Sequence, residues 1–140
     1  MSTPFKHILV PVDFSEMSDR AMSVVLESFQ GFEKITVIAV YEGTQNSVLD
    51  YENEVDHMLK KSANIEMSRF QQKYEKDNAV IETIVTKGNP AAEIIAMAKN
   101  LKVDVIVMGS QGRNSIASVF FGGTTYQVSR KASCSVLVIR

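Results

Sequence analysis

Residues 6–12 read Lys-His-Ile-Leu-Val-Pro-Val, a short apolar run that is rich in β-branched side chains. Such a run is either a buried parallel strand or a segment of a buried helix. Pro11 argues against the helix and indicates that the strand is close to its end. Residues 17–30 then place apolar side chains at helical spacing. We therefore predict that the chain begins with a strand followed by a helix.

The rest of the chain continues this alternation. Apolar strands separated by helices are typical of a parallel sheet covered on both faces. We predict one α/β domain over residues 1–140, an open, doubly wound, Rossmann-like sheet of five strands. A helix start is clearest at Asn89-Pro90, because Asn is a frequent N-cap residue and Pro fits the first helical position. The predicted strands are 6–12, 34–40, 79–86, 103–108 and 135–139, and the predicted helices are 17–30, 50–76, 89–101 and 124–131.

The composition is that of a globular protein, with 45% hydrophobic and 22% charged residues. Fifteen Lys and Arg residues stand against 16 Asp and Glu residues, so the charge gives no indication of nucleic-acid binding. The lone Cys134 cannot form an internal disulfide. No apolar run approaches the roughly 20 residues that span a bilayer, and no signal peptide is visible. We expect a cytoplasmic protein that does not bind a membrane.

The predicted helix 50–76 carries apolar residues at spacings of three and four. This stripe predicts one side that packs on the core, with Met58 on the same side and the charged residues in solvent. The stripe consists of Val55, Leu59, Ala63, Met67 and Phe70.

Two pairs of glycines follow the fourth predicted strand. Gly109 and Gly112 leave the strand, and after nine further residues Gly122 and Gly123 open a helix. Glycine lets a ligand approach the backbone closely, and the free N–H groups of a helix start bind anions. Glycines that only make turns are the alternative, but the whole arrangement favours a phosphate site. It is neither a Walker A loop nor the dinucleotide fingerprint.

Local charge supports the same interpretation. From residue 99 onward there are six basic residues, Arg113 among them, and a single acid, Asp104. The end of the chain is therefore cationic although the whole is almost neutral, which suits a phosphate.

Other catalytic or metal sites have no such support. His7 and His57 lack further ligand residues at metal-binding spacing, so we expect no metal site in the protein itself. Ser15 and Ser110 lack a nearby histidine that could activate them, so a hydrolase triad is not indicated. We assign no catalytic residue.

The spacing Gly109-x2-Gly112-x9-Gly122 resembles the ATP-binding signature of the universal stress protein family, Gly-x2-Gly-x9-Gly-Ser/Thr. The run from Ile8 to Ser15 resembles the first strand of that family and its ligand-facing aspartate. Gly88-Asn89-Pro90 and the closing residues 135–139 also match, so the resemblance spans the whole chain. It implies the strand order 3-2-1-4-5, in which the order reverses between the first and fourth strands.

The resemblance implies that ATP binds at this reversal, where Asp13 and the glycine loop would face each other. In the family, the aspartate and the main chain at the end of the second strand hold the nucleoside. Here these are Asp13 and Val40, and we count Pro11 beside them among the binding residues. The phosphates would lie on Gly109, Gly112 and Gly122. The alternative for Asp13 is an N-cap on the first helix.

One position departs from the family pattern, because Gly123 stands where Ser or Thr is expected. The Gly123 N–H can still donate to a phosphate, but the hydroxyl is missing, and Thr124 or Thr125 could supply it. Alternatively, Thr124-x-x-Gln127 is a capping box, which would turn the Thr124 hydroxyl toward the helix's own amides. ADP or AMP is then an alternative ligand to ATP, with Mg²⁺ accompanying the nucleotide.

Three function classes remain open. The first is an ATP-binding regulatory module, as in universal stress proteins, with a protein partner that the sequence does not identify. The second is a phosphoryl-transfer or hydrolytic enzyme, which would need metal-binding acids near the phosphates. Asp13 is the only acid that we expect at the crevice, so hydrolysis would be slow at most. The third is a receiver or flavin module, or an interaction module that needs no nucleotide, but the acids and lysine of a receiver are missing.

The last strand, residues 135–139, would lie at a sheet edge in the order 3-2-1-4-5. It is apolar and carries neither the proline nor the charges that protect exposed edges. Pairing with the same strand of a second copy would satisfy its free N–H and C=O groups. The resemblance also implies such a homodimer. The alternative is a monomer whose edge is shielded by Arg140 and the preceding loop.

Overall fold

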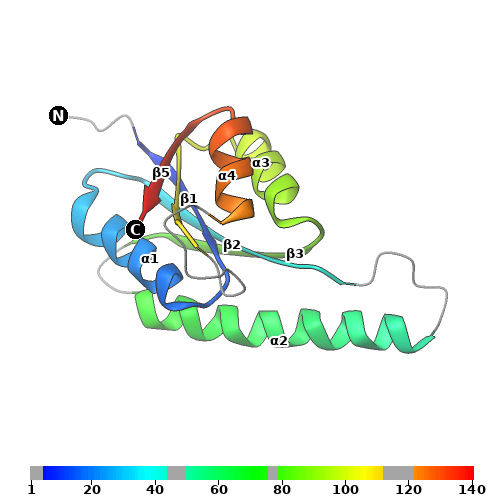
Figure 1. The fold of residues 1–140 in the computed structure, drawn as a ribbon. Helices are drawn as coiled ribbons and strands as arrows, with labels where there is room; N and C mark the ends of the chain where they lie inside the picture. Colours follow the sequence, from blue (N-terminus) through cyan, green and yellow to red (C-terminus); the bar gives the residue numbers. More distant parts are fainter. Residues whose placement is uncertain (1–4, 44–49, 76–78, 112–121) are drawn as a thin grey trace.

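The computed structural model describes residues 5–43, 50–75, 79–111 and 122–140. In these residues five strands alternate with four helices and form one parallel sheet of order β3-β2-β1-β4-β5 (Figure 1). The predicted fold class and strand order are confirmed. The elements are β1 (His7–Val12), α1 (Glu16–Ser28), β2 (Lys34–Tyr41), α2 (Asp50–Tyr74), β3 (Ile81–Lys87), α3 (Pro90–Asn100), β4 (Val105–Gly109), α4 (Gly123–Lys131) and β5 (Ser135–Ile139).

The sheet separates two helical layers, with α1 and α2 on one face and α3 and α4 on the other (Figure 1). Successive residues of β1 point to opposite faces, so Ile8 and Val10 pack toward α1 and α2, whereas Leu9 packs toward α3 and α4. All three side chains are fully buried. This two-sided burial explains why the central strand is a continuous apolar run and does not alternate with polar residues.

The pairing of β1 with its two neighbours is unequal. Six residues of β1, from His7 to Val12, pair with β2. Toward β4, the pairing comprises Ile8 with Val105 and Leu9 with Ile106. Proline has no N–H, so a sheet tolerates it only where no ladder hydrogen bond is required of it. The early end of the β1–β4 pairing provides Pro11 with such a position and leaves the two strands unpaired toward their carboxyl ends.

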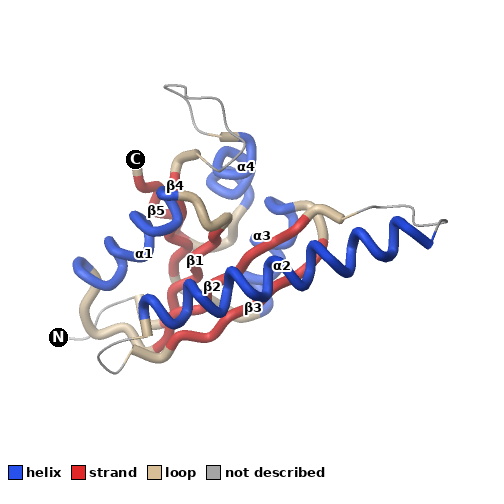
Figure 2. The backbone as a smooth tube through the Cα atoms, turned by 90° about the horizontal axis from the view of Figure 1, so that it is seen from below, coloured by secondary structure: helices blue, strands red, loops and turns tan. Residues whose placement is uncertain are grey.

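Helix α2 is longer than the sheet that it covers. Its 25 residues span about 37 Å, whereas a seven-residue strand such as β3 spans about 23 Å. Its N-terminal part therefore extends beyond the ends of β2 and β3 (Figures 1 and 2). In the described part of the chain, no helix combines the length and apolar character needed to cross a membrane.

The predicted core side of α2 is only partly correct. Met67 and Phe70 are buried, as predicted. Val55 is 40% exposed, Leu59 is 39% exposed and Met58 is 69% exposed. The prediction that these three side chains belong to the core is therefore wrong. The spacing of the stripe was correct, but the sheet ends before the helix does.

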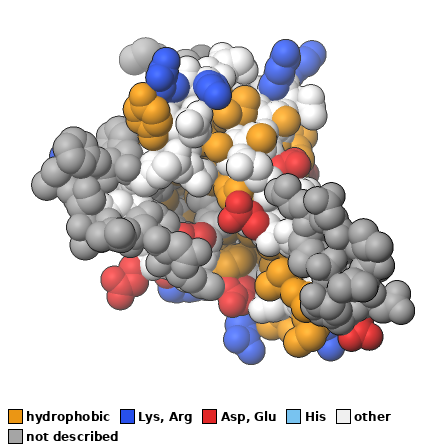
Figure 3. All heavy atoms as spheres, turned by 45° about the vertical axis from the view of Figure 1, so that its right-hand side comes forward, with side chains coloured by type: hydrophobic (Ala, Val, Ile, Leu, Met, Phe, Trp, Pro, Cys, Tyr) orange, Lys and Arg blue, Asp and Glu red, His pale blue; other side chains and the backbone are white. Residues whose placement is uncertain are grey.

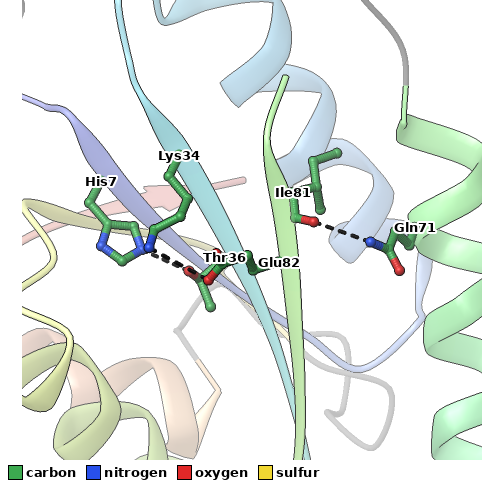
Figure 4. Close-up of polar contacts among 6 residues, drawn as sticks. All are labelled: His7, Lys34, Thr36, Gln71, Ile81 and Glu82. Carbon is green, nitrogen blue, oxygen red and sulfur yellow. Dashed lines mark hydrogen bonds and ion pairs between the residues drawn. The ribbon is translucent and has the colours of Figure 1, made fainter. Parts of the chain in front are cut away.

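Side-chain contacts hold α2 at both ends. Near its N-terminal end, Asp56 forms an ion pair with Lys87 at the end of β3. Near its C-terminal end, Tyr74 donates a hydrogen bond to Asp19 of α1. In addition, the Gln71 amide donates to the Ile81 carbonyl on the edge strand at 3.1 Å (Figure 4).

A polar cluster lies at the amino ends of the strands, which is the edge of the sheet opposite to the strand carboxyl ends. His7 Nε2 lies 2.7 Å from Thr36 Oγ1, and Lys34 pairs with Glu82 at 3.5 Å (Figure 4). The Asp104 carboxylate accepts the backbone N–H of His7 at 2.8 Å. Partial burial, followed by the nearby Lys34 ammonium, lowers the pKa of His7 below its ordinary value of 6.5, although Glu82 and Asp104 oppose this shift.

The lowered pKa predicts a pH-dependent stability. The folded protein favours the neutral imidazole of His7, so its free energy of unfolding should fall as the pH decreases below about 6.5. His7→Gln removes this titration and should flatten the pH dependence, which urea unfolding at pH 7.5, 6.5 and 5.5 measures. An unchanged slope in His7→Gln would contradict the assignment.

Candidate functional site

A cleft of about 600 Å³ opens at the carboxyl ends of the strands, where the sheet order reverses between β1 and β4. Its size is typical of small-molecule sites, and this reversal is where open α/β sheets bind ligands. Figure 3 views this end of the molecule, with hydrophobic and acidic side chains around a hollow. The cleft lies at the point where β1 and β4 are no longer paired.

Most of the residues predicted from the sequence line this one cleft. Asp13 follows β1, Val40 lies near the end of β2, and the glycines lie at the end of β4 and the start of α4. Gly112 and Arg113 lie outside the described residues. The predicted residues that line the cleft are Pro11, Asp13, Val40, Gly109, Gly122, Gly123 and Thr124.

The turn between β1 and α1 fixes the Asp13 carboxylate. Asp13 Oδ1 accepts the Ser15 backbone N–H and the Ser18 hydroxyl, both at 3.0 Å. The Asp13 N–H donates in turn to Ser18 Oγ at 2.9 Å. The N-cap residue of α1 is Ser15, so the alternative in which Asp13 is the N-cap is wrong. These bonds restrain the carboxylate at the edge of the cleft.

Phe14, the next residue, holds this turn in an unusual backbone conformation. Its φ of 65° lies in the left-handed region, which costs a bulky residue about 1–3 kcal/mol. Its ring meets the Phe70 ring of α2 edge-on, with centroids 6.1 Å apart. This packing against α2 offsets the strain and keeps Asp13 on the cleft side of the turn.

Backbone hydrogen bonds join the two ends of the glycine loop. The Ser110 N–H donates to the Ile139 carbonyl of β5 at 2.7 Å, and the Gly122 N–H donates to the Ser110 carbonyl at 2.8 Å. The start of α4 is therefore fixed directly beside the end of β4.

The start of α4 differs from the prediction. Gly122 is the N-cap residue and α4 begins at Gly123, so the predicted capping box at Thr124 is wrong. Thr124 is already inside the first turn. Thr125 is 3% exposed, and its hydroxyl donates to the Gly109 carbonyl at 2.8 Å. Thr125 is thus not the expected substitute for the missing hydroxyl at position 123.

The first turn of α4 borders the cleft, and its own N-cap residue provides no side-chain cap. Its N-cap Gly122 has no side chain, and the turn contains no acidic residue. The first N–H groups of a helix have no acceptor within the helix. Together with the helix dipole, they make this end of α4 suitable for a negatively charged group.

The other walls of the cleft contain residues that the sequence analysis missed. Ile38, Ile94 and Met108 add apolar surface on the α3 side. Glu42 and Glu66 also line the cleft, so the expectation that Asp13 is its only acid is wrong. Glu42 follows the end of β2 and could have been found by the strand-end argument that identified Asp13. Glu66 lies on α2 directly before the buried Met67, and the helix pattern did not indicate which part of α2 borders the cleft.

Gly109 and Gly123 differ in the space that surrounds them. A Cβ atom on Gly109 would lie 2.8 Å from the Met17 Cβ of α1, so the packing of α1 requires a glycine there even without a ligand. A Cβ atom on Gly123 would meet nothing within 4 Å.

Comparisons with known proteins agree with this architecture. The model of the universal stress protein family matches residues 4–140. Universal stress protein MJ0577 of Methanocaldococcus jannaschii is 28% identical, over 100% of this chain and 98% of its own. A solved structure of MJ0577 has a TM-score of 0.87 at 29% identity, covering 98% of this chain and 96% of that chain.

Two further solved structures have the same fold. UspA of Lactobacillus plantarum has a TM-score of 0.86 at 28% identity, covering 99% of this chain and 100% of that chain. A universal stress protein of Archaeoglobus fulgidus, solved in complex with dAMP, has a TM-score of 0.66 at 20% identity, covering 99% and 100%. At that identity, the second likeness concerns the fold alone.

The Gly109 contact predicts a stability effect that is independent of any ligand. Gly109→Ala should lower the free energy of unfolding by about 1–3 kcal/mol, because the new methyl group overpacks the contact with Met17. Gly123→Ala should not be destabilising. In a Met17→Gly background, which removes the opposing Cβ, Gly109→Ala should cost less. Denaturant unfolding of the wild type, the two single variants and the double variant measures this coupling. Equal costs in both backgrounds would show that Met17 is not the obstacle.

Proposed function

Because the chain belongs to the universal stress protein family, we propose that its cleft binds an adenine nucleotide, with ATP as the first candidate, and that the protein is a nucleotide-dependent regulatory module. The observation that carries this proposal is the convergence of three features on one cleft. They are an apolar slot, the restrained Asp13 carboxylate and the start of α4, whose N-cap residue is a glycine.

The nucleoside would occupy the side of the cleft between β1, β2 and α3. Pro11, Ile38 and Met108 offer apolar surface to a flat base, and the main chain at Val40 offers hydrogen-bonding groups at its edge. The Asp13 carboxylate would accept hydrogen bonds from the ribose hydroxyls, for which its contacts with Ser15 and Ser18 pre-orient it.

The phosphates would point toward the first turn of α4. Gly109, Gly122 and Gly123 allow close approach of an anion, and the amides of the turn can donate to it. Gly123 provides no hydroxyl, and the Thr125 hydroxyl is engaged by Gly109, so Thr124 is the described residue that would replace the missing contact. We propose that Gly112 and Arg113 complete the phosphate site.

Metal binding and hydrolysis are constrained by the acids near the phosphate site. Mg²⁺ binds largely through phosphates and water in nucleotide sites, so we propose that it enters with the nucleotide. Within the described ranges, no three His, Cys, Asp or Glu side chains gather into a metal site. Phosphoryl transfer needs acids near the phosphates. The sequence contains no Asp or Glu after Asp104, and the described acids of the cleft, Asp13, Glu42 and Glu66, do not gather into a three-ligand metal site, so we propose slow hydrolysis at most.

Gly123→Asp tests the proposed phosphate site. A carboxylate in the first turn should leave the free energy of unfolding unchanged or raise it by about 0.3–1 kcal/mol, because it complements the helix dipole. It should lower ATP affinity by about tenfold or more, because like charges brought together in an interface cost several kcal/mol. Urea unfolding measures the stability effect, and titration calorimetry with ATP and with adenosine measures the two affinities.

The matched control is Gly123→Asn, which has the same shape without the charge. Adenosine affinity should be the same in both variants, since adenosine has no phosphate. If Gly123→Asp binds ATP as tightly as Gly123→Asn does, the phosphates do not lie at α4. If the wild-type protein binds no adenine nucleotide, the protein acts as an interaction module without a nucleotide.

We also propose that two copies pair through the β5 edges. The strand is the last in the sheet, and Leu137 is 37% exposed on it. Antiparallel pairing across a two-fold axis would satisfy the outer N–H and C=O groups of both strands and bury apolar side chains from both copies.

Leu137→Lys tests this interface. The new charge should dissociate the dimer into monomers, because it would be buried without a partner between the two strands. Light scattering at micromolar concentration measures the mass. Val80→Lys, at a 52% exposed apolar position next to the opposite edge strand β3, is the matched control and should leave the dimer intact. A monomeric wild-type protein would refute the interface without affecting the nucleotide proposal.

A further inference from the structure

We propose that Thr125 is a positioning residue for the phosphate groups: its hydroxyl holds the start of α4 against the end of β4. The inference rests on the proposed nucleotide site and adds a residue that acts on that site from behind. Thr125 is 3% exposed, and its Oγ1 donates to the Gly109 carbonyl at 2.8 Å. Its hydroxyl is therefore committed to the backbone of β4.

The bond connects the two elements that the phosphate site depends on. Gly109 is the last residue of β4, and Thr125 is the third residue of α4. The backbone already joins them at the base of the loop, where the Gly122 N–H donates to the Ser110 carbonyl at 2.8 Å. The Thr125 bond lies three residues further along the chain than this backbone bond. Two separate bonds resist rotation of the helix start, whereas one bond would leave a pivot.

The residue type at this position supports a role for the hydroxyl. A buried hydroxyl without a hydrogen-bond partner is costly, and valine has the same shape without that cost. Thr125 is followed at spacing three by Val128, which is fully buried on the same side of α4. A threonine at an otherwise apolar, buried position is therefore explained by its bond to Gly109.

The orientation of the α4 amides should matter for phosphates and not for the nucleoside. Hydrogen bonds weaken steeply when the donor angle departs from linearity, so a small rotation of the first turn reduces several contacts to an anion at once. The apolar slot and Asp13 are carried by β1, β2, α3 and Met108 of β4, whereas the Thr125 bond ends on the Gly109 carbonyl beyond them, so we expect the nucleoside contacts to survive its loss. The measurable quantity is thus the ratio of ATP affinity to adenosine affinity.

The test compares Thr125→Val with Thr125→Ser by calorimetry. Thr125→Val should lower ATP affinity about tenfold or more, as misplacement of binding groups commonly does, and leave adenosine affinity within about twofold. Thr125→Ser keeps the hydroxyl and should retain the wild-type ratio. If Thr125→Val does not fold, Thr125→Cys, with only a weak donor, replaces it with the same expectation.

Val128→Ala separates positioning from general destabilisation, because it weakens the packing of α4 without affecting the hydroxyl. Val128→Ala should retain the wild-type ratio of ATP affinity to adenosine affinity even when its loss of thermal stability is comparable to that of Thr125→Val. An unchanged ratio in folded Thr125→Val, or an equal drop in Val128→Ala, would overturn the inference while nucleotide binding stands. A wild-type protein that binds adenosine and ATP equally, or neither, would overturn the phosphate site itself, and this inference with it.

Discussion

The unequal pairing of the central strand is the constraint on which the site depends. β1 pairs with β2 as far as Val12 but with β4 only as far as Leu9. Beyond Leu9 the two strands no longer hold each other, and the cleft opens between them. The turn that carries Asp13 forms one side of this opening, and the glycine-rich end of β4 forms the other. Pro11 is compatible with this divergence because it has no N–H to contribute to a ladder.

Helix α2 provides the third wall of the cleft. Leu59 and Glu66 line the cleft from the part of α2 between Asp56, which pairs with Lys87 at the end of β3, and the buried Met67. Met58, beside Leu59, is exposed. Contacts with β3 near one end and α1 near the other, through Asp56 and Tyr74, keep this wall in place.

Much of the fold could be predicted from the sequence, because apolar runs, helical spacing and the Asn89-Pro90 start all indicate the same elements. The strand order came from the family resemblance and not from periodicity. Side-chain roles at the site were less predictable. Placing the N-cap of α4 at Thr124 instead of Gly122 shifts the helix by two residues, which assigns the wrong role to both threonines. Helical phase decides which hydroxyl faces the cleft, and a small shift in the boundary changes that phase.

The glycine motif therefore combines several physical requirements. Gly109 accommodates Met17 of α1, whereas Gly122 leaves the start of α4 without a side-chain cap. The described starts of α1 and α3 are different, since both have acidic residues in the first turn, and Asn89 also caps α3 with its side chain. These helices complement their own dipoles, and α4 does not. Under the proposed function, the nucleotide phosphate would provide the negative charge that α1 and α3 obtain from their own residues. Phosphate binding and the stabilisation of the start of α4 by a negative charge would then be the same interaction.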